Sequence, residues 1–191
     1  MSSSATADQI LDCAQALLVD GGYNAFSYAD IAAVVGIRKA SIHHHFPAKA
    51  ELVQKLVARY RAEAEAGLAG IATSVADPYD QLCTYVQYWT ACIAEARPSY
   101  CICVMLAGEL PSLPEPVAVE VRAHFRSLAV WLGAVMAQGD TAGSVCLTDT
   151  IETEAEAFVA TVHGAMLSAR AHGDPALFGK IIAPLLQRLA P

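Results

Sequence analysis

The sequence is poor in charge and has no long apolar run. Charged side chains make up 16% of the 191 residues and hydrophobic side chains 55%. No uncharged run approaches the roughly 20 apolar residues of a membrane span, and the start, MSSSATADQIL, has neither the positive nor the apolar segment of a signal peptide. The β-branched runs that favour sheets are also scarce. We therefore expect an all-α, cytoplasmic protein with a large buried surface and no membrane partner.

The sequence also lacks a compact cysteine framework. Its six cysteines stand at positions 13, 83, 92, 101, 103 and 146, and a reducing compartment would keep them as thiols. Most of them are expected to be small core residues. There is no Ser/His/Asp pattern, no phosphate-binding loop and no carboxylate pair with metal-ligand spacing. We accordingly expect neither enzyme activity nor a cofactor.

Positive charge is concentrated in one short part of this acidic chain. The net charge of −7 argues at first against nucleic acid. Residues 1–61, however, hold six Lys/Arg against five Asp/Glu, whereas residues 62–191 hold six against fourteen. All six basic residues of the first part lie at or after Arg38. The sequence therefore offers a local basic surface near its beginning.

Helical periodicity recurs along the whole chain, and no convincing strand or repeat interrupts it. Ser27 and Asp30 form a short capping box, and Gly36 is suited to a left-handed helix end. The helix between them is expected to bury Ile31, Val34 and Val35. Nine helices are predicted, at about residues 7–22, 27–35, 38–45, 48–75, 78–97, 100–110, 115–138, 150–171 and 175–189.

Three consecutive histidines, His43 to His45, lie in the third predicted helix. Neighbouring helical side chains point about 100° apart, so these histidines cannot converge on one ion and no metal site is expected. Periodicity places Ile42, His45 and Phe46 on the inner face of this helix. The outer face then carries Lys39, Ala40, His43 and His44.

Two short helices joined by a glycine-containing turn, the second with basic residues, form the sequence pattern of a helix-turn-helix. Lys39 could donate to guanine, His43 to a base or phosphate, and Ala40 could contact a thymine methyl group. Ser41, His44 and Lys49 are better placed for phosphates. On spacing alone, a solvated and slightly basic helical hairpin remains an open alternative.

Residues 5–60 resemble the DNA-binding domain of TetR-family transcriptional repressors. The resemblance rests on GYNAFSYADIAAVVGIRKASIHHHFPAKAELV, with GY before the second helix, the DIA…G turn and the KASI, HFPAK and Leu ending. It implies a DNA-binding domain over 1–48 and a ligand-binding and dimerisation domain over 49–191. The implied partners are a palindromic DNA operator, a second copy of the chain bound through the last two helices, and a small-molecule effector.

Transferred by position, the resemblance assigns base contacts to Lys39, Ala40 and His43 and core positions to His45 and Phe46. It assigns contacts with the DNA backbone to Tyr28, Ser41, His44 and Lys49. Two departures matter. Position 43 is commonly tyrosine in the family, and histidine adds a protonation step near neutral pH, so binding would tighten as pH falls. The segment before the first helix has no basic residue, which implies a shallow salt dependence. The candidate DNA-contacting residues are Tyr28, Arg38, Lys39, Ala40, Ser41, His43, His44 and Lys49.

The later part of the chain carries an aromatic stripe and a cysteine pair. The stripe consists of Tyr85, Tyr88, Trp89 and Cys92 at i, i+3, i+4 and i+7. It is either a pocket wall whose aromatic rings bring polar groups or plain core packing. Cys101 and Cys103, two apart on a predicted helix, would point to different faces and would neither chelate one ion nor form an unstrained disulfide. The candidate ligand-binding residues are Tyr85, Tyr88, Trp89, Cys92, Cys101, Cys103, Met105 and His163.

The cysteine segment resembles a TetR subgroup in which some repressors respond to electrophiles through cysteine. A thiol near Arg97 would then have a lowered pKa, whereas the alternative is an inert core residue. The sequence thus predicts a homodimeric repressor that is released by a small apolar or electrophilic effector. A thiol-based redox regulator is the second reading, and a helical carrier or enzyme is the alternative from another class.

Overall fold

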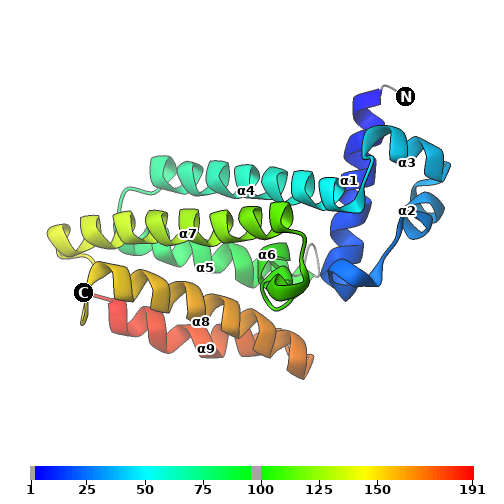
Figure 1. Ribbon diagram of the computed structural model, residues 1–191. Coiled ribbons are helices and arrows are strands. Elements are labelled where there is room, and N and C mark those ends of the chain that lie inside the picture. Colours follow the sequence, from blue (N-terminus) through cyan, green and yellow to red (C-terminus); the bar gives the residue numbers. More distant parts are fainter. Residues whose placement is uncertain (1–2, 96–99) are drawn as a thin grey trace. The chain divides into compact units, whose positions relative to one another are not determined.

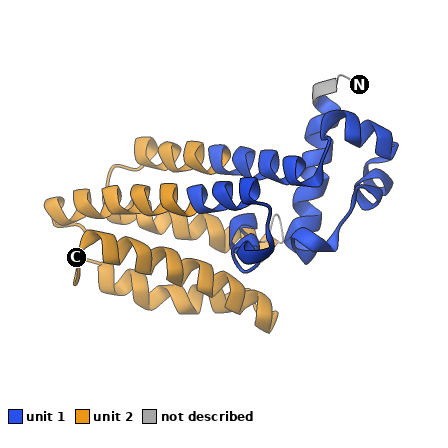
Figure 2. Cartoon of the chain, in the orientation of Figure 1, with its two compact units in different colours: residues 1–62, 101–124 blue, residues 63–100, 125–191 orange. Residues whose placement is uncertain are grey.

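The computed structural model describes residues 3–95 and 100–191. Within these ranges the chain forms nine α-helices and two short 3₁₀ helices without any strand, which confirms the predicted all-α class (Figure 1). Packing divides the chain into two compact units, coloured separately in Figure 2. Unit 1 comprises the described residues up to Ala62 together with Cys101–His124. Unit 2 comprises the other described residues. The predicted boundary between residues 48 and 49 is not tested by this division and stays a prediction.

Unit 1 is built on a core that unites the early helices with the middle of the chain. Ile10, Ile31 and Ile42 are fully buried together with Leu52 and Ile102. α1 packs against α2, α3 and α6. The elements are α1 (Ser3–Gly21), η1 (Tyr23–Ala25), α2 (Tyr28–Val35), α3 (Lys39–His45), the first part of α4 (Lys49–Ser74), α6 (Ile102–Ala107), η2 (Leu110–Ser112) and the first part of α7 (Glu115–Ala142).

Unit 2 contains the remaining parts of α4 and α7 with α5 (Pro78–Glu95), α8 (Ile151–His172) and α9 (Ala176–Leu189). α8 and α9 lie side by side, and α5 also packs against α9 (Figure 1). Arg188 on α9 donates two hydrogen bonds to Glu154 on α8, at 2.8 and 2.6 Å. Glu154 is only 3% exposed and the Arg188 side chain is 37% exposed, so this ion pair is a partly buried connection between the two helices.

Helix ends agree with the sequence signals where those signals are local. Pro78 is the first residue of α5, Thr150 accepts a hydrogen bond from the Thr153 amide before α8, and Gly173 ends α8 with φ 62°. Several helix bounds differ from the expectation, among them the start of α1 at Ser3 and the end of α6 at Ala107. α7 extends to Ala142, and α6 starts only at Ile102, so that Cys101 precedes it in extended backbone. No described helix is both long and apolar enough to cross a bilayer.

Candidate nucleic-acid interface and effector site

The hairpin of α2 and α3 is held by its own polar groups. The Ser27 hydroxyl accepts from the Ala29 amide at 3.2 Å, and the Ser27 amide donates to the Asp30 carboxylate at 2.7 Å, so the predicted capping box is present. Hydrogen bonds from Ser27 lower the pKa of Asp30. Gly36 ends α2 with φ 75°, a left-handed conformation that favours glycine. The capping box thus fixes the start of α2, and Gly36 sets the turn from α2 into α3.

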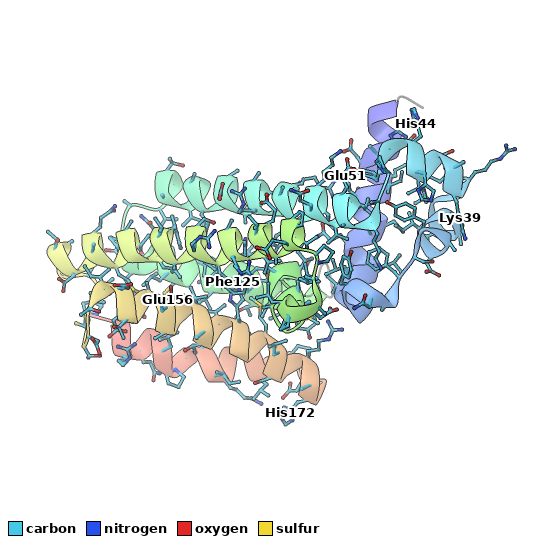
Figure 3. The ribbon with its side chains drawn as sticks, in the orientation of Figure 1. Lys39, His44, Glu51, Phe125, Glu156 and His172 are labelled. Carbon is cyan, nitrogen blue, oxygen red and sulfur yellow. The ribbon has the colours of Figure 1, made fainter. Side chains whose placement is uncertain are left out.

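α3 separates an apolar face from a polar one, as its periodicity predicts. Ile42 is fully buried and Phe46 is 3% exposed, whereas His45 is only half-buried. Val34 on α2 departs from the expectation, because it is 69% exposed. Figure 3 labels two residues of the polar face, Lys39 and His44. The exposed residues of this face are Arg38, Lys39, Ala40, His43 and His44, with Ser41 half-buried at its edge.

Two predicted phosphate contacts are already engaged inside the protein. The Tyr28 hydroxyl donates to the Phe46 carbonyl at 2.8 Å, and burial raises the pKa of Tyr28 to about 12. The Lys49 ammonium donates to the Phe26 carbonyl and lies 4.1 Å from the centroid of the Phe26 ring, while burial lowers its pKa. In this structure both residues therefore join α2, α3 and α4 to one another instead of offering free donors to a phosphate.

His43 is exposed but has a defined orientation. Its Nδ1 lies 3.3 Å from the Pro47 carbonyl oxygen, and its ring packs edge-on against Tyr28 with centroids 4.7 Å apart. A carbonyl only accepts, so Nδ1 must carry the proton of this hydrogen bond. The other ring nitrogen, Nε2, is then the atom left for a partner. It accepts when the ring is neutral and donates when the ring is protonated.

The aromatic stripe on α5 is split by the fold. Tyr85 and Trp89 are each 6% exposed, whereas Tyr88 is 56% exposed and Cys92 is half-buried. Tyr88 was predicted to line the ligand site, but its side chain is exposed and therefore lies at the edge of the stripe, outside its buried part. Burial raises the pKa of Cys92. The inner part of the stripe is thus limited to Tyr85 and Trp89.

Buried ring nitrogens without a partner lie on three helices of unit 2. Both nitrogens of His163 on α8, Nε1 of Trp89 on α5 and Nε1 of Trp131 on α7 have no hydrogen-bond partner among the described residues. His163 is 4% exposed and packs edge-on against Phe125, which Figure 3 labels, at 5.1 Å between centroids. Tyr85 lies 5.9 Å from Trp131 between ring centroids. Sequence reasoning found His163 but missed Trp131, because no local spacing relates α7 to α5.

Cys101 and Cys103 converge, contrary to the prediction that they point apart. Cys101 precedes α6 with φ −64° and ψ 123°, so the 100° helical rotation does not apply between them. Their sulfur atoms and a ring nitrogen of His124 on α7 all lie within 4.8 Å of one another. Burial, followed by the hydrogen bond and charge of Cys101, raises the pKa of Cys103, which opposes the predicted lowered pKa. Arg97 lies outside the described residues, and Met105 is half-buried.

Family models match both the early and the later part of the chain. The family of bacterial regulatory proteins described as the tetR family matches residues 10–56, and the tetracyclin repressor-like C-terminal domain matches residues 78–184. A TetR-family transcriptional regulator from Agrobacterium tumefaciens is similar at 57% identity, with a TM-score of 0.98 and 100% of each chain covered. No curated protein sequence matches the chain.

Two further solved structures extend the likeness of fold. A TetR transcriptional regulator from Legionella pneumophila shares 25% identity, with a TM-score of 0.84 and 95% of each chain covered. The reduced form of E. coli NemR shares 18% identity, with a TM-score of 0.85 and 97% of each chain covered. At 18% identity, the similarity to the E. coli NemR structure concerns the fold alone.

Proposed function

The chain belongs to the TetR family of bacterial regulatory proteins, and from this premise we propose that it is a ligand-responsive repressor that binds a palindromic operator as a homodimer. The observation that carries the proposal is the division of α3. Ile42 and Phe46 hold this helix against the core, and Lys39, Ala40 and His43 stay exposed on one side of it. Such a face suits insertion into a major groove. The protein would act in the cytoplasm, where the operator lies.

The DNA-binding step is tested with a labelled duplex from upstream of the protein's own coding region. Fluorescence anisotropy should show sequence-preferring binding that weakens as the salt concentration rises, because phosphate contacts release counterions. Arg122→Ala controls for the loss of one positive charge away from α3, since Arg122 is exposed on α7 and pairs with Glu115. It should bind like the wild type. Binding that ignores both sequence and salt would contradict the proposal.

The proposed dimer interface is the outer side of α8 and α9. An exposed row of mostly small residues follows α8 at alternating spacings of four and three, a pattern that lets helices approach closely. A Cβ added at Gly164 or Gly179 would meet no atom of the chain. Glycine in a helix interior costs roughly 0.5–1 kcal/mol relative to alanine, and packing within the chain does not explain it here. The row on α8 is Thr153, Ala157, Ala160, Gly164, Leu167 and Ala171.

Gly164→Glu tests this interface, with Gly67→Glu on α4 as the matched control. Both glycines are exposed, helical and free of nearby atoms. Sedimentation velocity should show a dimer for wild type and for Gly67→Glu, and a monomer for Gly164→Glu. The monomer should also lose most of its operator affinity, because two recognition helices spaced about 34–36 Å apart are needed for successive grooves. A dimeric Gly164→Glu would contradict the assignment.

The proposed effector site lies between α5, α7 and α8 in unit 2. Its walls are aromatic, and the unpartnered nitrogens of Trp89, Trp131 and His163 are polar groups that a ligand could satisfy. An apolar molecule with one or two hydrogen-bond acceptors fits this chemistry. Such a ligand releases DNA only if it binds more tightly to the form that cannot engage the operator. The unpaired nitrogens supply a reason for tight binding.

A compound screen read out by thermal shift and operator release tests the effector site. Trp89→Phe removes one ring donor and should raise the effector concentration needed for release by about tenfold, the equivalent of one hydrogen bond of roughly 1.4 kcal/mol. Tyr88→Phe is the control, because Tyr88 is exposed on the same helix. Equal effects of the two variants would place the effector elsewhere.

An electrophilic effector acting on Cys101 or Cys103, or a redox switch between them, has weaker support. Both thiols are fully buried and the pKa of Cys103 is raised, so the nucleophilic thiolate is disfavoured in this state. The closeness of the two sulfur atoms nevertheless favours it over a carrier or enzyme function. Alkylation that releases operator from wild type but not from Cys101→Ser would support the electrophile reading against the non-covalent one.

A further inference from the structure

A buried cluster in unit 1 combines two thiols with an imidazole. Cys101 and Cys103 are fully buried and His124 is 5% exposed. The first cysteine immediately precedes α6, the second lies in its first turn, and the histidine comes from α7. Cys101 Sγ lies 3.7 Å from His124 Nε2. The three donor atoms lie within 4.8 Å of one another, so three elements of backbone converge on one point.

The donor distances suit a metal ion better than a disulfide. Tetrahedral coordination with Zn–S and Zn–N bonds of about 2.3 and 2.0 Å requires donors separated by about 3.6–3.8 Å. The 3.7 Å between Cys101 and His124 already has this length, and the remaining separations are at most 4.8 Å. A disulfide would instead require the sulfur atoms to approach to about 2.05 Å.

Charge selects the kind of ion. Two thiolates with one neutral imidazole carry a charge of −2, which a divalent cation cancels, whereas a monovalent ion would leave a buried negative charge. The nearest charged side chains do not alter this balance, since Arg61 pairs with Glu120 at 3.2 Å. The same ion pair holds the Glu120 carboxylate, which lies one turn before His124 on α7. Sulfur and imidazole donors are those that Zn²⁺ prefers.

We propose that Cys101, Cys103 and His124 form a binding site for one thiophilic divalent cation, Zn²⁺ being the physiological example. Three protein ligands leave the fourth position of a tetrahedral ion for water. The Tyr60 ring, 5.4 Å from the His124 ring between centroids, covers one side of the imidazole. The bound ion would join α6 to α7 within the unit that also contains α1, α2 and α3. This inference goes beyond the proposed function and does not depend on it.

Cobalt and zinc binding to the full-length, reduced protein test the site without DNA. After removal of metal with a chelator, Co²⁺ should produce the near-ultraviolet absorption of thiolate-to-cobalt charge transfer. Titration with Zn²⁺ in competition with a chromophoric chelator should show that one Zn²⁺ binds per chain. Zn²⁺ should also raise the melting temperature of the protein. Cys103→Ser and His124→Gln should weaken zinc binding at least tenfold. Cys83→Ser, a half-buried cysteine of unit 2, should bind like the wild type.

X-ray absorption at the zinc edge of the wild-type protein keeps the test independent of any variant that fails to fold. Two sulfur neighbours at about 2.3 Å support the site. Absence of the cobalt charge-transfer band, a zinc shell made of oxygen and nitrogen alone, or equal weakening by Cys83→Ser and Cys103→Ser would overturn it. None of these readouts involves an operator, so failure of the metal site and failure of the proposed repressor function are distinguishable.

Discussion

The hairpin of α2 and α3 in unit 1 and the aromatic interior of α5, α7 and α8 in unit 2 treat their polar side chains in different ways. On the hairpin of α2 and α3, polar groups are either paired within the chain, as Ser27 is with Asp30, or exposed, as Lys39 is. In unit 2, Trp89 and His163 hold buried ring nitrogens with no partner among the described residues. An exposed polar group keeps its water until a partner arrives. A buried one without a partner costs about 1–3 kcal/mol at all times.

This difference separates two kinds of recognition. The exposed face of α3 gains from a charged partner that approaches through water, and salt should weaken it. The buried nitrogens of unit 2 gain from a ligand that supplies hydrogen bonds where water has been excluded, and salt should matter little there. Variants that remove one feature and spare the other therefore test whether the contrast is real.

The largest effect is expected in unit 2, where the buried carboxylate of Glu154 accepts several hydrogen bonds. Glu154 accepts two hydrogen bonds from Arg188 and two from Thr148, and the hydrogen bond from Arg188 is the main cause that lowers the Glu154 pKa to about 2. Arg188→Met removes the charged partner of this buried carboxylate and leaves it only the two hydrogen bonds from Thr148. The free energy of unfolding should fall by about 3 kcal/mol, the lower end for a buried pair, because the Arg188 side chain is 37% exposed. Urea denaturation followed by circular dichroism measures this change.

Arg122→Met is the control for the loss of Arg188, because its ion pair with Glu115 is exposed and should contribute less than about 1 kcal/mol. The pH dependence gives a second check. A lowered pKa in the folded state means that the Glu154 contribution is present above pH 4.5 and is lost as the pH falls toward 2. Arg188→Met should flatten this part of the profile. An equal loss of unfolding free energy in Arg188→Met and Arg122→Met would show that the Glu154–Arg188 pair has no special role.

On the surface of unit 1, Lys39→Ala should leave folding unchanged and weaken operator binding by about 1–3 kcal/mol. Lys39 is exposed at the start of α3. Selection of bound sequences from a random pool should show relaxed preference at one base pair in each half-site. Intact preference with uniformly weaker binding would reassign Lys39 to a phosphate.

The sequence was sufficient for the features that depend on neighbours along the chain. Helix ends at Gly36 and Pro78, the capping box and the inward face of α3 follow from spacings of one to four residues. The reach of Lys49 to the Phe26 carbonyl and of Tyr28 to Phe46 could not be predicted in this way. Those contacts span 18 residues or more, and both side chains therefore appeared available for DNA.

The cysteine pair shows the same limit within a short segment. A spacing of two residues predicts divergence only if both residues are helical. Cys101 is extended, and no sequence signal separates it from the apolar helix that follows. The third member of the cluster, His124, is on another helix and was not identified as a candidate. This convergence depends on how α6 and α7 are placed within unit 1, which helical periodicity does not predict.

A smaller effect is expected when an unpartnered group is removed from unit 2. His163→Leu deletes both buried ring nitrogens while keeping an apolar side chain against Phe125. The free energy of unfolding should stay constant or rise by about 1 kcal/mol, because no hydrogen bond is lost. His124→Leu, at the other buried histidine, removes a contact with Cys101 and should destabilise the protein. Similar losses in the two variants would mean that His163 has a partner within the chain.

The smallest effect concerns His43 and the pH dependence of operator binding. Because Nδ1 donates to the Pro47 carbonyl, the ring atom left for DNA is Nε2, which donates only when the ring is protonated. Operator binding is therefore compared over a range from pH 8 to pH 6. The negatively charged backbone and the acceptor edges of guanine both favour a donor. Operator affinity measured by anisotropy should therefore rise as the pH falls, by under about 1 kcal/mol.

His43→Tyr should retain binding and lose this pH dependence, since a tyrosine hydroxyl keeps its proton throughout the range. His172→Gln controls for an exposed histidine of unit 2, labelled in Figure 3, and should preserve the wild-type slope. His44→Gln separates the neighbouring ring on the same helix. If the slope disappears in His44→Gln and persists in His43→Tyr, the titrating contact belongs to His44. In that case the Pro47 hydrogen bond serves only to pack His43 on Tyr28. The DNA-contacting surface of α3 would then include fewer residues than its periodicity predicts.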